Sequence, residues 1–205
     1  LAVESQESGF FDREIIPLTL PDGTVVSKDD GPRASSSLEK LASLPEAYGG
    51  GGVTAGNSCP LNDGAAAALI MSDEKARAPA LKPRARTITP ATAGNEPEYM
   101  GVAPIGAIKK ALERAGMTIE DVDTVELNEA FAAQVIPIMD ECGIPLEKMN
   151  PHGGAIALGH PFGHPGVPTM TPLINGLESD DKPIGLETMC VAGGQGEAMI
   201  VERIA

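Results

Sequence analysis

The chain has 205 residues and a mass of 21.1 kDa, enough for one large domain with a sizeable buried core. Its 15 Lys and Arg stand against 29 Asp and Glu, and the formal net charge of −14 repels nucleic acids and anionic membranes, so we expect neither as a partner. Aromatic residues make up 3% of the chain and Trp is absent, so Ala, Val, Ile, Leu and Met must build the core. This composition suits layered α/β packing.

The cysteines, Cys59, Cys142 and Cys190, are odd in number and lack paired spacing. We therefore expect no disulfide framework, no zinc site and a reducing compartment. No segment approaches about 18 consecutive apolar residues, and no basic region precedes an apolar run at the N-terminus, which predicts a cytoplasmic protein without a membrane span or signal peptide. The sequence begins at Leu1, inside a pattern typical of the end of a polar helix, and is interpreted as a fragment.

Residues 8–52 are polar and rich in turn-forming sequences, including Pro-Asp-Gly at 21–23. We expect surface excursions with little core, in which residues 15–20 and 24–26 pair as short strands and residues 37–44 form a short helix. Arg33 and Lys40 are the cations of this region. Each is either a solvated surface charge or a contact for an anionic ligand.

From residue 53 the sequence becomes small and apolar, with a turn in its middle. The run at 65–71 is consistent with a central strand or with one side of a packed helix. We favour the strand, because the run is short and a polar segment able to begin a surface helix follows it. Pro79 and Pro83 bracket a linker.

After this linker the pattern becomes regular. It predicts strands over 84–89 and 122–127, each followed by a helix, at 104–115 and 129–142. A helix over 167–177 and two strands over 185–191 and 197–203, joined by a Gly-Gly-Gln-Gly turn, complete the chain. This order indicates a mixed sheet with helices packed on it.

Residues 150–166 contain all three histidines, five glycines and three prolines. Gly costs backbone entropy and Pro removes a hydrogen-bond donor, so this stretch cannot form a regular helix. It is either a turn between packed elements or an active-site loop.

Three candidate groups follow predicted strands or lie in this loop, where ligands bind in open α/β sheets. Asn128 is either a helix N-cap or a substrate contact, Cys190 an inert buried thiol or a reactive one, and His160 a loop histidine that bonds backbone or a catalytic one. Together, a cysteine, a histidine, an amide donor and glycine-rich backbone are the groups that acyl transfer through a thiolate and an oxyanion hole requires.

Four segments also resemble motifs of the thiolase family: residues 57–64, 128–134 (Asn-Glu-Ala-Phe-Ala-Ala-Gln), 153–161 (Gly-Gly-Ala-Ile-Ala-Leu-Gly-His-Pro) and 190–196 (Cys-Val-Ala-Gly-Gly-Gln-Gly). The resemblance covers nearly the whole chain and is strongest to bacterial acetyl-CoA acetyltransferases and 3-ketoacyl-CoA thiolases. It implies a substrate, acyl-CoA or coenzyme A, and no bound cofactor. Since family members form dimers or tetramers, it also implies a homo-oligomer.

The resemblance implies that Cys190 is the acid/base that moves a proton on the substrate α-carbon or the CoA sulfur. His160 would activate the nucleophilic cysteine and, with a water held by Asn128, would form the oxyanion hole for the thioester carbonyl.

Four further positions match substrate-contacting positions of the family. Phe131 and Cys59 match residues that line the pantetheine channel, and Arg33 roughly matches a cation near the CoA phosphates. Ala192 replaces a glycine whose N–H helps hold a second oxyanion, which requires a negative φ there.

Other departures concern the nucleophile and the loop. The nucleophilic cysteine of the family lies in an N-terminal half that this sequence does not contain, so the isolated chain should not complete thiolysis. His152 stands where the family usually has Asn, and His152 and His164 are expected to be structural. Pro165, Pro168 and Pro172 occupy a segment in which the family has a helix without prolines, so the helix starts late or is unusual.

We therefore expect an α/β, thiolase-like layered fold: a mixed five-stranded sheet with helices on both faces and the N-terminal half missing. Residues 1–52 would be a remnant of the loop domain, 53–82 the last elements of the N-terminal core domain and 83–205 the C-terminal domain. The expected function is acyl transfer between thioesters, with the N-terminal half of the enzyme as a partner. The alternatives are a ketosynthase-type condensing enzyme and an inactive thiolase-like binding or assembly module.

Overall fold

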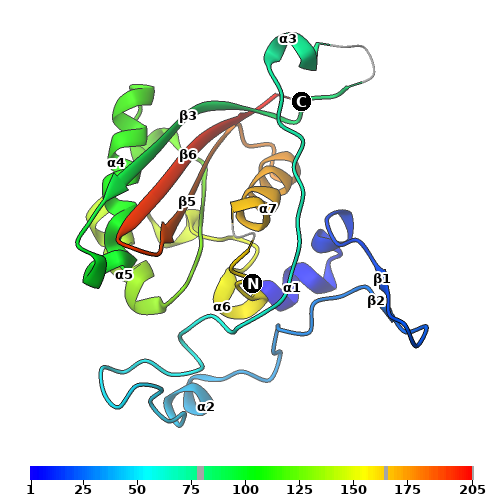
Figure 1. Cartoon of the computed structure of the whole chain (residues 1–205), viewed down its shortest axis with the longest axis vertical. Coiled ribbons are helices and arrows are strands. Elements are labelled where there is room, and N and C mark those ends of the chain that lie inside the picture. Colours follow the sequence, from blue (N-terminus) through cyan, green and yellow to red (C-terminus); the bar gives the residue numbers. More distant parts are fainter. Residues whose placement is uncertain (78–80, 164–165, 205) are drawn as a thin grey trace.

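A four-stranded mixed sheet forms the centre of the molecule in the computed structural model, which describes residues 1–77, 81–163 and 166–204 (Figure 1). The strand order is β3-β6-β5-β4. β3 (Ala85–Gly94) and β5 (Ile184–Val191) pair antiparallel with β6 (Gln195–Arg203), and β4 (Thr124–Leu127) runs parallel to β5. The mixed sheet is confirmed, whereas the predicted count of five strands is wrong.

Two helices cover one face of this sheet, α4 (Ala103–Ala115) and α5 (Ala132–Cys142). Their apolar sides meet alternate residues of the strands, because successive strand side chains point to opposite faces. The resulting core includes Ile108, Ala111, Val125, Ile138, Leu186 and Ile200.

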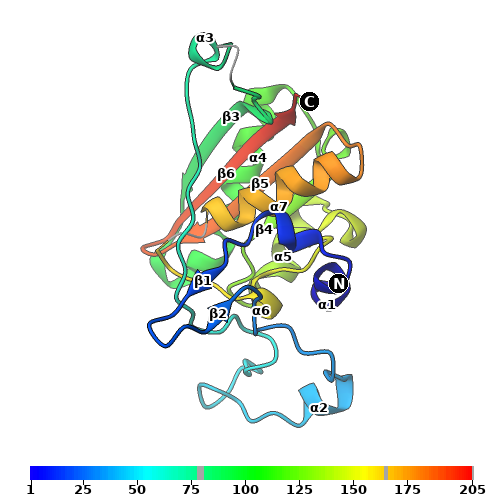
Figure 2. The same ribbon diagram turned by 90° about the vertical axis from the view of Figure 1, so that its right-hand side faces the viewer.

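The helix α7 (Gly166–Ser179) lies on the opposite face (Figure 2). Leu173 and Leu177 are fully buried and pack against Val201 of β6. The expected helix is therefore present and contains Pro172 in its interior. A proline there has no N–H to donate to the carbonyl four residues earlier, that of Pro168. His164 and Pro165 lie outside the described residues.

The predicted helix over 129–142 begins three residues late, at Ala132. Backbone contacts with the preceding segment explain this, because Ala132 N donates to the Asn57 carbonyl at 2.9 Å and Phe131 pairs with Ser58 as an isolated bridge. Phe131 is the N-cap residue, so Asn128 is not a helix cap.

The strand expected at 65–71 is absent from the structure. These residues have no regular structure, and Leu69 and Ile70 are 80% and 86% exposed. A strand needs a neighbouring strand to pair with, and nothing in the described chain pairs with or covers this run. Periodicity identified an apolar segment correctly but could not show whether the described residues contain a packing partner for it.

The first 77 residues lie along the outside of the sheet domain with little regular structure (Figure 1). The expected hairpin and short helix are present as β1 (Leu18–Thr19), β2 (Val25–Val26) and α2 (Leu38–Ala42). The other short elements are the α-helices α1 (Ala2–Glu7), α3 (Asp73–Ala76) and α6 (Ala155–Leu158) and the 3-10 helices Phe10–Arg13, Pro97–Val102, Ile119–Asp121 and Leu146–Lys148.

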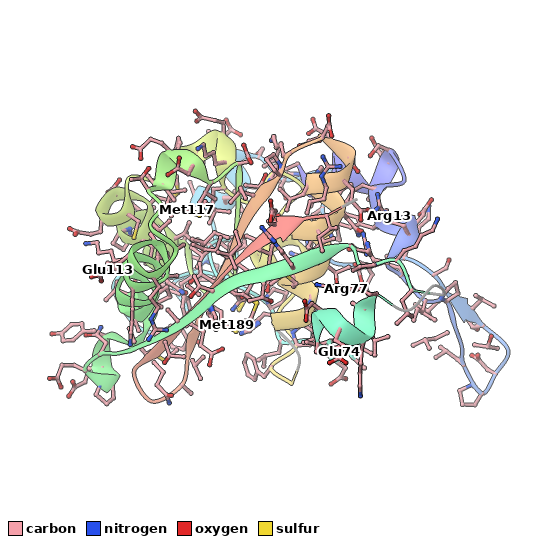
Figure 3. All side chains as sticks on the ribbon, turned by 90° about the horizontal axis from the view of Figure 1, so that it is seen from above. Arg13, Glu74, Arg77, Glu113, Met117 and Met189 are labelled. Carbon is pink, nitrogen blue, oxygen red and sulfur yellow. The ribbon has the colours of Figure 1, made fainter. Side chains whose placement is uncertain are left out.

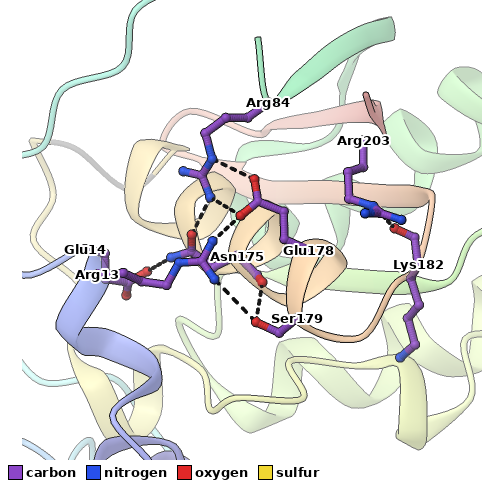
Figure 4. Close-up of polar contacts among 8 residues, drawn as sticks. All are labelled: Arg13, Glu14, Arg84, Asn175, Glu178, Ser179, Lys182 and Arg203. Atoms are coloured by element: carbon purple, nitrogen blue, oxygen red, sulfur yellow. Dashed lines mark hydrogen bonds and ion pairs between the residues drawn. The ribbon is translucent and has the colours of Figure 1, made fainter. Parts of the chain in front are cut away.

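A polar network ties this outer segment to α7 (Figure 4). Glu178 of α7 forms ion pairs with Arg13 and with Arg84, the latter at 2.8 Å. Asn175, also on α7, donates to Glu14 at 2.6 Å and accepts from Arg84 at 2.6 Å. The network therefore joins the N-terminal segment, α7 and the start of β3.

No helix of the described residues is both long and apolar enough to cross a membrane.

Candidate active site

Asn128 directly follows β4 at the carboxyl end of a parallel strand pair. Its side chain is buried, at 2% exposed, and its backbone N–H donates to the Thr188 carbonyl of β5 at 3.0 Å. Its amide Nδ2 lies 3.3 Å from His160 Nε2. The structure thus brings two of the predicted catalytic residues into contact.

His160 is held in the loop by contacts on both its backbone and its ring. Its N–H donates to Asn62 Oδ1 at 3.1 Å, and Leu61 pairs with it as a parallel bridge. The ring meets Phe162 edge to face, with centroids 5.1 Å apart. Residues 61 and 62 therefore help to position the imidazole.

Two residues that the sequence analysis missed shape the glycine-rich loop, Asn150 and Glu129. The buried Asn150 side chain bonds both backbone groups of Leu127: Oδ1 accepts at 2.8 Å and Nδ2 donates at 3.0 Å. Asn150 Nδ2 also donates to Glu129 Oε1 at 2.7 Å, and Ile156 N donates to Glu129 Oε2 at 3.1 Å. This network fixes the loop to the end of β4.

The loop also requires glycine at position 154. A Cβ there would lie 2.1 Å from the Glu129 carboxyl carbon. The absence of a side chain at Gly154 is therefore what lets Glu129 reach the amide of Ile156.

Cys190 lies near the end of β5, the strand next to β4, and is half-buried. Burial raises the pKa of its thiol, and the adjacent Gln134 side chain partly offsets this shift. The thiol is therefore mainly protonated at neutral pH and suited to donating a proton.

The turn after β5 contains Ala192 and two glycines with positive φ. Ala192 is exposed and is not among the described residues with positive φ. The backbone at position 192 therefore has the conformation that alanine requires where the family has glycine. At Gly194 a Cβ would lie 2.3 Å from the Asn95 carbonyl oxygen, so only glycine fits.

Cys59 lies close to these residues. Its N–H donates to the Ala130 carbonyl at 3.0 Å, which places it beside the segment that leads from Asn128 to Phe131. Burial raises the pKa of the Cys59 thiol, and the nearby Cys190 and Glu129 raise it further.

An open, mainly apolar cavity of about 340 Å³ adjoins Phe131. Gln134, at 3% exposed, lines it. Apart from the interaction of Gln134 with the Cys190 thiol, neither of its amide atoms has a hydrogen-bond partner among the described residues. Sequence reasoning missed Gln134, although it lies one helical turn after Phe131. Other lining residues include Tyr48, Val53 and Tyr99.

The remaining candidates lie away from these contacts. Arg33 is exposed, on a segment where Gly31 packs so closely that a Cβ would lie 2.7 Å from the Ala157 carbonyl. His152 stacks on Phe10 with ring centroids 3.6 Å apart, and burial lowers the pKa of its imidazole. His152 thus contacts the N-terminal segment.

Among the described residues no group of three or more His, Cys, Asp or Glu side chains is arranged to hold a metal ion. The contact between Asn128 and His160 places an amide and an imidazole where they can hold a carbonyl oxygen or a water, and Cys190 places a thiol at the neighbouring strand end. This combination suits thioester chemistry.

The sequence matches the family models described as "Thiolase, N-terminal domain" over residues 1–74 and "Thiolase, C-terminal domain" over residues 81–203. The chain belongs to the thiolase family.

The known proteins that are similar to this chain are named as acyltransferases, acetyltransferases or thiolases. A probable acetyl-CoA acyltransferase of Staphylococcus epidermidis is 45% identical, over 98% of this chain and 52% of the relative. The crystal structure of the Bacillus anthracis acetyl-CoA acetyltransferase is 42% identical with a TM-score of 0.96, covering 99% of this chain and 52% of that one. Human mitochondrial 3-ketoacyl-CoA thiolase in complex with CoA is 34% identical with a TM-score of 0.95, covering 99% and 51%. The chain spans about half the length of these proteins.

Proposed function

We propose that the chain is the C-terminal part of a thiolase, which cleaves a 3-ketoacyl-CoA with coenzyme A or condenses two acetyl-CoA molecules. The observation that carries the proposal is the 3.3 Å contact between Asn128 Nδ2 and His160 Nε2, beside the strand end that holds Cys190. Family membership and the acyltransferase relatives support it.

In the cleavage direction, a nucleophilic cysteine from the N-terminal half loses its proton to His160 and attacks the 3-keto carbon. The bond between C2 and C3 then breaks, the electron pair moves to C2, and Cys190 delivers a proton there. His160 and a water held by Asn128 stabilise the negative oxygen of the departing enolate. The Cys190 thiolate next takes the proton of the CoA thiol, and the CoA thiolate attacks the carbonyl of the acyl-enzyme. The thioester bond to the nucleophilic cysteine then breaks, and this cysteine takes back the proton held by His160.

The remaining site residues contact the substrate in this proposal. Phe131, which also lines the apolar cavity, and Cys59 line the pantetheine path, and Ala192 contributes its backbone N–H to the second oxyanion. Arg33, exposed on the segment packed against α6, meets a CoA phosphate.

The domain boundaries remain part of the proposal: residues 1–52 from the loop domain, 53–82 from the N-terminal core domain and 83–205 as the C-terminal domain. The exposed apolar run at 65–71 supports an N-terminal half as a partner, because such a run is stable in a strand only when a neighbour covers it. The half-length match to the relatives agrees with this.

The test joins the N-terminal half of the Bacillus anthracis enzyme to Leu1 and measures acetoacetyl-CoA thiolysis. The chimera should be active, and Cys190→Ala or His160→Ala should reduce kcat by at least about 100-fold. Cys142→Ala is the matched control, since this cysteine packs against the core on α5 and should leave kcat unchanged. An inactive binding module predicts a folded chimera without thiolysis, and this result would refute the proposal.

A further inference from the structure

Two buried carboxyl groups lie side by side beneath α7. Glu126 of β4 is 3% exposed and Glu187 of β5 is 5% exposed, and the two are direct register partners in the parallel pair. Their neighbours Val125 and Leu186 belong to the core under α4 and α5, so strand alternation places both glutamates on the α7 face. Parallel strands lie about 4.8 Å apart, close enough for two carboxylates to repel strongly.

The surroundings of this pair supply little to neutralise a negative charge. Thr169 of α7 donates to Glu187 Oε1 at 2.8 Å, whereas Glu126 Oε1 is buried without a hydrogen-bond partner among the described residues. Among the described residues, the charged groups that shift the pKa values of the two side chains are acidic: Glu129, Glu14 and Glu187 act on Glu126, and Glu197 acts on Glu187.

Two cations that contact α7, Arg13 and Arg84, belong to the network of Figure 4. Arg13 and Arg84 both pair with Glu178, and neither is among the charged groups that shift the pKa of Glu126 or of Glu187. A full negative charge on both members of the pair would therefore be buried without compensation, which costs several kcal/mol per ion.

We propose that Glu126 and Glu187 share protons as a buried carboxylic acid pair, and that release of a proton to solvent near neutral pH weakens the packing of α7 on the sheet. Burial raises the pKa of Glu187 from 4.5 to about 7. Burial, with repulsion from Glu129, Glu14 and Glu187, raises the pKa of Glu126 well above its ordinary value. The two carboxyls thus lose their protons as a pair, not independently.

The position of the pair connects it to the candidate active site. Glu126 of β4 precedes Asn128 by two residues, Glu187 precedes Cys190 by three residues on β5, and α7 begins six residues after His160. Ionisation of the pair would therefore place charge on β4 and β5, next to α7, and these three elements lead to the site. This consequence for the reaction rests on the proposed function, whereas the ionisation itself does not.

The sign of the pH dependence follows from the raised pKa. Because the folded chain holds the protons more tightly than the unfolded chain, the pair stabilises the fold fully below about pH 4.5, and the contribution of Glu187 is lost as pH rises to about 7. The chain should therefore be more stable in mild acid than at neutral pH.

The experiment is urea denaturation of the 205-residue chain, with wild type, Glu187→Gln and Glu113→Gln compared at about pH 5 and about pH 8. The amide side chain introduced by Glu187→Gln cannot ionise but keeps an oxygen that can accept from Thr169. Glu113 is the matched control, since it projects from α4 on the side remote from α7 (Figure 3).

Between these pH values the folding constant of wild type should fall on the order of 100-fold more than that of Glu187→Gln, and Glu113→Gln should follow wild type. Equal falls for wild type and Glu187→Gln would overturn the proposal. If Glu187→Gln does not fold, Glu126→Gln takes its place in the denaturation experiment. The infrared carbonyl band of protonated carboxyl groups is then also measured in wild type. That band should be present at about pH 6 and lose intensity by about pH 8 as Glu187 ionises, and its absence at about pH 6 would equally overturn the proposal. An inactive chimera with this band present would refute only the proposed function.

Discussion

The substitution Gly154→Ala tests how the glycine-rich loop is held. Gly154 has φ −110° and ψ −172°, an extended conformation that alanine adopts without strain. The added Cβ would nevertheless lie 2.1 to 2.3 Å from the carbon and both oxygens of the Glu129 carboxylate. Glu129 must therefore move away, and its bonds from Asn150 Nδ2 and Ile156 N are lost.

The cost follows from these two bonds. Each is a hydrogen bond to a charged group, which contributes about 1.5–3 kcal/mol. Replacing glycine by alanine recovers about 0.4–1 kcal/mol through the smaller conformational freedom of the unfolded chain. Gly154→Ala should thus lower the free energy of unfolding by about 3 kcal/mol.

Urea denaturation measures this change, with Gly163→Ala as the control in the same loop, since a Cβ at Gly163 would meet no atom within 4 Å. The control should remain within about 0.5 kcal/mol of wild type. In the chimera, Gly154→Ala should also lower kcat, because the loop carries His160. Wild-type stability in Gly154→Ala would show that the bonds of Glu129 do not hold the loop.

Leu177→Ala should cost about 2–5 kcal/mol in urea denaturation, because Leu177 is fully buried, whereas Leu146→Ala, at a side chain 74% exposed, should change little. Lys148→Met should lower the free energy of unfolding by about 2 kcal/mol, because Lys148 Nζ donates to three backbone carbonyls. Lys109→Met, which loses one ion pair at 3.6 Å, should lower it by under about 0.5 kcal/mol. Equal costs for the two variants would contradict this account. Burial raises the pKa of Glu14 from 4.5 to about 7, so Glu14→Gln should reduce the loss of stability between pH 4.5 and about 7, measured by denaturation across that range.

The sheet domain was largely predictable from the sequence. Helix and strand periods, with glycine stops at Gly116 and Gly143, predicted α4, α5, α7 and the strands β4, β5 and β6 closely, whereas β3 continues five residues beyond its predicted end at residue 89. The start of α5 was predicted three residues early, because its first residues are bound by backbone contacts with Asn57 and Ser58. Such long-range contacts leave no periodic signal.

The run at 65–71 shows a different limit. Its composition is that of a buried strand, but burial depends on a neighbour, and its side chains are exposed in this chain. An apolar pattern therefore predicts that a segment is buried against a neighbouring segment, but it does not identify that neighbour.

The sequence predicted the candidate catalytic residues better than the residues that hold them in position. Asn128 and His160 were identified from residue type and motif, and the structure places them in contact. Asn150, Glu129 and Gln134 were missed, because a buried amide or carboxylate that orients backbone resembles an ordinary surface residue in the sequence. Their roles depend on geometry that only the fold supplies.

Cys190 as the proton-transferring group is the central claim, and its substitution in the chimera tests it most directly. With acetyl-CoA, Cys190→Ala should still form the acyl-enzyme, seen by intact mass, but should lose exchange of the α-protons with deuterated solvent. Unchanged α-proton exchange in Cys190→Ala would contradict the account.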